Sequence, residues 1–279
     1  MRAVQRVNDR RAVLASLLCA VALTLAGGAA HAAPEPWALW DAENAASTEV
    51  VDHSAWSRWL DRFLVPGDDG INRVRYRAID AAGQDELDDY VADLAAIDPR
   101  RLNRDEQFAY WANLYNAVTV QVVLKYPNKK SILRMGEKLF KIGPWDDAAV
   151  SVAGESLTLN DIEHRILRPI FKDERVHYAV NCASIGCPNL RMAPFTGAQL
   201  EAQLAAAERD YLSHERGVML SRKGLRLSKI FKWYREDFAS TETELIEYLA
   251  ARHPSLGEAL SAFDGRVRYE YDWNLNIAE

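Results

Sequence analysis

The residues best suited to covalent chemistry lie close together in one stretch of the sequence. Residues 175–188 contain a histidine and two cysteines, and a second histidine, His164, lies shortly before them. A thiol becomes a strong nucleophile when a neighbouring histidine, cation or helix N-terminus lowers its pKa. Cys182 is therefore the candidate nucleophile, with His177 or His164 as its base and an Asn, such as Asn181, or an Asp to orient that base. This set of residues favours thiol-dependent acyl transfer or hydrolysis.

The same spacing also permits a disulfide. Cys182 and Cys187 are separated by four residues that include Ser184 and Gly186, which favours a tight turn. Disulfides are stable in exported proteins, and a bridge here would leave no resting nucleophile. The alternative function is then a non-catalytic binding or scaffold domain of the cell envelope. The redox state of the two cysteines distinguishes the two functions.

The local structure around the histidine affects which base is available. The apolar, β-prone residues 175–181 predict a strand. On a strand, His177 and Cys182 would point to opposite faces. A catalytic pair therefore requires the strand to end before Cys182, or His164 to approach from its own helix.

Two amides occur where the pattern predicts a buried core. Residues 103–125 predict a helix that has apolar side chains on nearly every face, which is typical of a helix in the centre of the core. This helix contains Asn113 and Asn116, whose buried amides must be hydrogen-bonded. We expect both to bond outside their own helix, either as clamps on a neighbouring loop or as part of a site. In a binding domain they would hold a peptide or glycan together with Lys229 and Lys232.

The sequence predicts no metal site and no cofactor. The spacing of Cys182 and Cys187 lacks the second ligand pair of a structural zinc site, and it is not the Cys-x-x-Cys spacing of redox motifs. The glycines are isolated and form no phosphate-binding loop.

Residues 1–32 have the layout of a secretory signal peptide. A basic start is followed by an uncharged apolar run over residues 12–26 and by a small-x-small cleavage site, Ala30–Ala32. The run is short for a membrane span. We expect an exported protein, periplasmic or secreted, whose mature chain starts with a loosely ordered segment over residues 33–50.

The net charge of the chain limits the kinds of partner that we expect. Loss of four Arg and one Asp with the leader would change the net charge from −6 to about −9. An acidic chain does not favour nucleic acid or an anionic membrane as a partner, and no later stretch is apolar enough to span a bilayer. We expect a substrate or protein of the envelope as the partner.

The pattern of the elements predicts an α+β fold with short, mostly antiparallel strands in one globular domain, residues 51–279. Helical periodicity and glycine-centred turns define the elements. Predicted helices are 53–64, 84–97, 103–125, 160–168, 196–214 and 242–252; predicted strands are 74–79, 175–181, 267–273 and the hairpins 150–159 and 218–227.

Five segments in a fixed order resemble one known family. They are residues 108–117 (FAYWANLYNA), 159–164 (LNDIEH), 177–182 (HYAVNC), 228–234 (SKIFKWY) and 271–276 (YDWNLN). The series is similar to the domain of unknown function 547, and the leader suggests an exported bacterial member. The resemblance implies one intact domain over nearly all of the mature chain and marks the five segments as the places to look. It implies no particular activity.

Overall fold

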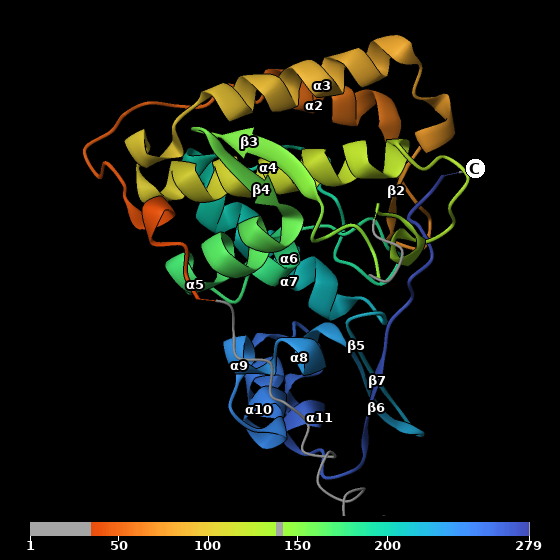
Figure 1. Ribbon diagram of the computed structural model, residues 1–279. Coiled ribbons are helices and arrows are strands. Elements are labelled where there is room, and N and C mark those ends of the chain that lie inside the picture. The colour runs from red at the N-terminus through yellow and green to blue at the C-terminus, as the bar shows by residue number, and fades with distance from the viewer. Residues whose placement is uncertain (1–34, 138–141, 279) are drawn as a thin grey trace, which may run out of the picture. The chain divides into compact units, whose positions relative to one another are not determined.

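A long buried helix organises the fold. The computed structural model describes residues 35–137 and 142–278, and α4 (Arg104–Leu124) runs through its core (Figure 1). The side chain of Asn103 begins the helix by accepting a hydrogen bond from the Glu106 amide at 3.0 Å. Nearly every residue from Glu106 to Val123 is buried. The predicted central core helix is confirmed.

Helices flank α4 on two sides. The helices α2 (Ser54–Phe63) and α3 (Ala81–Ala96) lie along one side of it, and α6 (Val176–Ala179) and α7 (Leu200–Ser213) lie on the other (Figure 1). The described residues also form α5 (Arg168–Phe171), α8 (Ile230–Trp233), α9 (Arg235–Phe238), α10 (Glu242–Arg252) and α11 (Gly257–Ser261). Short 3₁₀ helices cover Ala38–Asp41, Tyr76–Ala78, Pro99–Arg101, Ile132–Arg134 and Gly197–Gln199, and a π-helix covers Asp161–Leu167.

The strands form small separate sheets. Two antiparallel pairs are β1 (Leu64–Pro66) with β2 (Asn72–Val74), and β3 (Ala148–Val152) with β4 (Glu155–Thr158). A third sheet pairs β5 (Val218–Ser221) antiparallel with β6 (Gly224–Ser228), and β6 parallel with β7 (Val267–Glu270). The α+β class with short, mostly antiparallel strands is confirmed.

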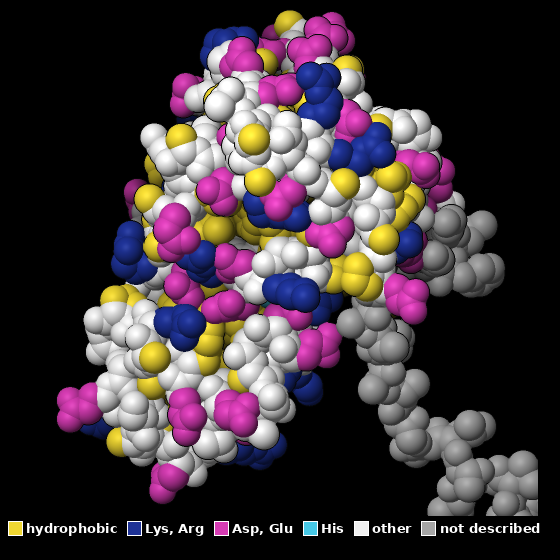
Figure 2. Space-filling view, turned by 90° about the vertical axis from the view of Figure 1, so that its left-hand side faces the viewer, with side chains coloured by type: hydrophobic (Ala, Val, Ile, Leu, Met, Phe, Trp, Pro, Cys, Tyr) yellow, Lys and Arg dark blue, Asp and Glu magenta, His cyan; other side chains and the backbone are white. Residues whose placement is uncertain are grey.

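The apolar side chains gather in two clusters. One surrounds α4, and the other packs β5 to β7 against α8 to α11. On the face shown in Figure 2, acidic and basic side chains are interspersed with apolar ones. Trp40, in the segment before α2, is only 1% exposed and packs against Trp111 of α4. No helix of the described ranges is both long and apolar enough to cross a membrane.

The C-terminal tail after β7 ties distant segments together. The amide of Val74 donates to the carbonyl of Asn276 at 2.8 Å, and the amide of Asn276 donates to the carbonyl of Ala183 at 3.0 Å. The amide of Ile185 also donates to Asn274. The tail therefore lies between β2 and the loop that contains both cysteines.

Two predicted strands differ from the structure. Residues 175–181 are not a strand, because a turn of helix (α6) occupies Val176–Ala179; the Asp173 carboxylate accepts a hydrogen bond from the Arg175 amide at 2.9 Å and starts this turn. The predicted strand 74–79 ends at Val74, where the chain enters a 3₁₀ helix. In both segments tertiary contacts override β propensity.

Candidate functional site

The loop that contains both cysteines is shaped by Asn181. Its side-chain amide donates to the carbonyl of Pro188 at 2.6 Å and accepts from the amide of Ala183 at 2.8 Å. Ala183 has a φ of 59°, a left-handed conformation that is uncommon for a residue with a Cβ. Asn181 is buried and does not line the pocket described below; its side chain bonds within the loop and also accepts a hydrogen bond from Asn276 Nδ2 at 3.4 Å.

The two amides of α4 hold backbone on two different segments. Asn116 donates to the carbonyl of Ala179 at 3.0 Å and accepts from the amide of Asn181 at 2.8 Å. Asn113 makes the same pair of bonds, both with the backbone of Phe195, at 2.8 and 3.0 Å. Both amides are buried and bond outside their helix, as predicted. Asn116 therefore fixes the chain immediately before Cys182.

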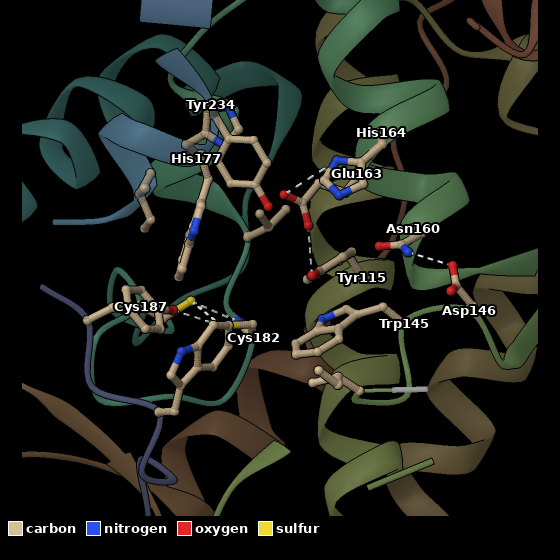
Figure 3. Close-up of a pocket in the computed structure, with 16 residues that line it drawn as sticks. Tyr115, Trp145, Asp146, Asn160, Glu163, His164, His177, Cys182, Cys187 and Tyr234 are labelled. Atoms are coloured by element: carbon tan, nitrogen blue, oxygen red, sulfur yellow. Dashed lines mark hydrogen bonds and ion pairs between the residues drawn. The ribbon is translucent and has the colours of Figure 1, made fainter. Parts of the chain in front are cut away.

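A pocket of about 250 Å³ opens beside this loop (Figure 3). Figure 3 shows Cys182, Cys187 and His177 on one side of it, with Glu163, His164 and Tyr115 across from them. The complete lining is Tyr115, Ile142, Trp145, Asp146, Asn160, Glu163, His164, His177, Val180, Cys182, Cys187, Ile230, Trp233, Tyr234, Tyr271 and Trp273.

The thiol of Cys182 is surrounded by hydrogen-bond donors. Its Sγ lies 2.8 Å from Cys187 Sγ, 3.1 Å from Ser184 Oγ and 3.1 Å from Tyr271 Oη. The bond from Cys187 lowers the pKa of Cys182, burial opposes this, and the bonds from Ser184 and Tyr271 lower it further. Burial raises the pKa of Tyr271, so its hydroxyl keeps its proton and can donate. The site therefore favours the thiolate of Cys182.

Cys187 is the buried partner of this thiolate. Burial raises its pKa well above the usual range, so it remains a thiol, and its Sγ also accepts a hydrogen bond from the Cys182 amide at 3.0 Å. The two sulfurs are farther apart than the ~2.05 Å of a disulfide, and both cysteines are free. The bridge allowed by the sequence is thus not formed in the structure, because the loop brings the sulfurs into contact as a hydrogen-bonded pair.

An aspartate orients His177. His177 Nε2 lies 2.5 Å from Asp237 Oδ2, and its ring stacks on Tyr234 with centroids 4.3 Å apart. Arg168 binds the same carboxylate through Nε at 2.6 Å. Burial alone would raise the pKa of Asp237, but the hydrogen bonds from His177 and Arg168 outweigh it and lower the pKa to about 2. The ionised carboxylate favours a proton on Nε2, which leaves Nδ1 as a proton acceptor.

His164 and Glu163 reach the pocket from the π-helix. Glu163 Oε2 accepts a hydrogen bond from Tyr115 at 2.9 Å, and Oε1 lies 3.8 Å from His164 Nδ1. Burial lowers the pKa of His164, which keeps its imidazole neutral. The sequence predicts that the short helix ends before Pro169. The chain instead stays helical through Phe171, because proline is tolerated in the first turn of α5. π-Helical turns occur frequently at functional sites.

Residues 99–212 match the family described as "Protein of unknown function, DUF547". The chain contains a DUF547 domain. No curated protein and no solved structure matches it.

The DUF547 domain supplies most of the reactive groups of the pocket. Both cysteines, His164, Glu163 and His177 lie within it, whereas Asp237 and several aromatic walls come from later residues. Lys229 and Lys232, predicted as binding residues, do not line the pocket, and Lys232 is exposed.

Sequence reasoning missed several residues of this site: Tyr115, Trp145, Glu163, Tyr234, Asp237 and Tyr271. Three of them, Tyr115, Trp145 and Glu163, lie within residues 99–212, whereas Tyr234 and Tyr271 lie in segments that are assigned to the family only by the resemblance of their sequence. Nothing in the spacing points to Asp237, which meets His177 across 60 residues of sequence. In residues 35–137 and 142–278, no group of three or more His, Cys, Asp or Glu side chains is arranged to hold a metal ion.

Proposed function

We propose that the protein is a thiol-dependent acyltransferase or hydrolase. The observation that carries the proposal is that one pocket is lined both by Cys182, whose pKa is lowered, and by His177, which Asp237 orients. A nucleophile, a base and a third group that orients the base are the parts that acyl transfer requires.

The first half-reaction transfers the acyl group to the enzyme. The Cys182 thiolate attacks the carbonyl carbon of an ester, thioester or amide, and a carbon–sulfur bond forms. The bond from that carbon to the leaving group breaks, and His177, which holds the thiol proton, gives it to the leaving group. Asp237 stabilises the imidazolium before that transfer.

The second half-reaction releases the acyl group. Water, or an amine or alcohol acceptor, loses a proton to His177 and attacks the thioester carbon. The carbon–sulfur bond then breaks and restores the thiolate. The hydroxyls of Tyr271 and Ser184, each 3.1 Å from Cys182 Sγ, stabilise the returning negative charge.

The reaction belongs outside the cytoplasm in this proposal. The signal-peptide pattern lies in residues 1–32, outside the described residues, and it supports export to the periplasm or the medium with an envelope molecule as substrate. N-terminal sequencing of mature protein should begin at Ala33. A mature protein that starts at Met1 would contradict export by cleavage.

Covalent trapping tests the chemistry. We expect incubation with p-nitrophenyl acetate, followed by mass spectrometry, to place an acetyl group on Cys182. The adduct should persist in Cys187→Ser and disappear in Cys182→Ser. His177→Gln should slow both its formation and its loss. An adduct that survives Cys182→Ser, or a Cys182 that is alkylated by iodoacetamide no faster than a small free thiol at pH 7, would refute the proposal.

A further inference from the structure

We propose that this pocket binds the positively charged ammonium group of its substrate, between an aromatic wall and the carboxylate of Glu163. This assignment of substrate class rests on the proposed function, and the binding test below does not depend on catalysis.

Glu163 is a buried carboxylate whose Oε1 accepts no hydrogen bond from the residues that the structure describes. It is only 6% exposed, and Tyr115 occupies Oε2. Among residues 35–137 and 142–278, no donor lies within hydrogen-bond distance of Oε1; the nearest basic nitrogen is His164 Nδ1 at 3.8 Å. His164 is neutral because burial lowers its pKa. A buried negative charge of this kind is costly without a cationic partner.

The nearby arginine is already engaged. Arg168 pairs with Asp237 at 2.6 Å and with Glu236 at 3.3 Å, and it does not line the pocket. The lining that the structure describes includes the carboxylate of Glu163 and no Lys or Arg. A positively charged group of a ligand can therefore pair with the carboxylate of Glu163.

Aromatic rings form a continuous wall of the same pocket. Trp273 lies in the middle, with its ring centroid 5.9 Å from that of Trp145, 5.4 Å from that of Trp233 and 4.6 Å from that of Tyr271. Trp233 is 41% exposed, which is unusual for so large an apolar side chain. The faces of such rings attract cations, and tryptophan does so most strongly. An alkylammonium group satisfies both the wall and the carboxylate.

A matched series of three probes isolates the charge. Choline, its neutral isostere 3,3-dimethylbutan-1-ol and the anion 3,3-dimethylbutanoate have similar bulk and differ in charge. Their Kd values are measured by isothermal titration calorimetry on the full chain with Cys182→Ser, so that no covalent step contributes. We expect choline to bind about tenfold more tightly than the neutral isostere and the anion to bind most weakly.

Three further variants locate the site. Glu163→Gln, which can still accept the hydrogen bond from Tyr115, should remove most of the preference for choline. Trp233→Leu changes an exposed side chain and should weaken choline binding by roughly threefold to tenfold. Glu247→Gln, an exposed carboxylate on α10 outside the pocket, is the matched control and should leave binding unchanged.

The outcomes separate the two proposals. Equal or tighter binding of the neutral or anionic probe, no binding of choline at millimolar concentration, or a full preference retained in Glu163→Gln would overturn the ammonium site. If Glu163→Gln fails to fold, the Trp233→Leu variant tests the ammonium site. An unchanged Kd for choline in Trp233→Leu would then overturn the site. If Cys182 is not acylated, the proposed function is refuted. The Kd values of the three probes still test the ammonium site, because they do not depend on acylation.

Discussion

The amide of Asn116 offers a sharp test of how the cysteine loop is held. Asn116→Leu removes one hydrogen bond to the carbonyl of Ala179 and one from the amide of Asn181. Both bonds are buried, so the two backbone groups cannot turn to water instead.

The expected loss of stability follows from those two groups. Each orphaned buried group costs about 1–3 kcal/mol. Leucine recovers about 1–2 kcal/mol through its larger apolar surface. With the middle of both ranges, we expect Asn116→Leu to lower the free energy of unfolding by about 2.5 kcal/mol, measured by urea denaturation.

Asn113→Leu is the matched control, because Asn113 makes the same two bonds with Phe195, away from the cysteines. It should cost a similar free energy. Only Asn116→Leu should also loosen the environment of Cys182 and raise the pKa of its thiol. A rise of half a pKa unit to one unit should slow alkylation at pH 7 by roughly threefold to tenfold. Equal slowing in both variants, or a loss below ~1 kcal/mol in Asn116→Leu, would refute this reasoning.

Three other perturbations have definite expected results. Burial lowers the pKa of His53 to about 4 from its usual 6.5. The free energy of unfolding should therefore decrease by about 3 kcal/mol as the pH falls from 6.5 towards 4, because the folded state resists protonation of this histidine. Urea unfolding of His53→Gln should not show this decrease. Tyr271→Phe removes a donor to Cys182 and should move the pH midpoint of iodoacetamide alkylation upwards, whereas an unchanged midpoint would show that this bond does not stabilise the thiolate. Asp237→Asn should slow acetyl transfer by roughly 100-fold or more, because the amide cannot stabilise the His177 imidazolium; a wild-type rate would exclude His177 as the base.

Local signals were sufficient for much of the fold. The cap at Asn103 and the all-round apolar pattern predicted α4 to within about two residues at each end. Gly154 and Gly224 marked two hairpins, and both have a positive φ, 86° and 105°. These features depend on neighbours in sequence, which is why periodicity and turn chemistry predict them.

Features that depend on distant partners were harder to predict. Residues 175–181 have β propensity, but Asn116 binds both Ala179 and Asn181 and holds a turn of helix instead. The parallel pairing of β6 with β7 joins strands about 40 residues apart, which no local pattern shows.

The candidate site also combines residues that the sequence predicts with a partner that only the tertiary structure shows. The sequence predicted the thiol and the histidines, and the structure brings Cys182, His177 and His164 to one pocket. The group that orients His177 is Asp237 rather than Asn181, because the amide of Asn181 is used in closing its own loop. A residue's type limits what it can do, but its assignment to a partner requires the tertiary structure.

The position of the C-terminal tail has a consequence for biosynthesis. Asn274 and Asn276 hydrogen-bond to the loop of Cys182, and Tyr271 reaches the sulfur itself. A ribosome makes these residues after the cysteine loop, and the two segments can pack together only when both are present. The environment that activates Cys182 is therefore complete only after residues 271–276 have packed against the loop. A chain without residues 271–276 would keep Cys187 and Ser184 beside Cys182 but would lose the bond from Tyr271, so the full environment of the thiol depends on the completed fold.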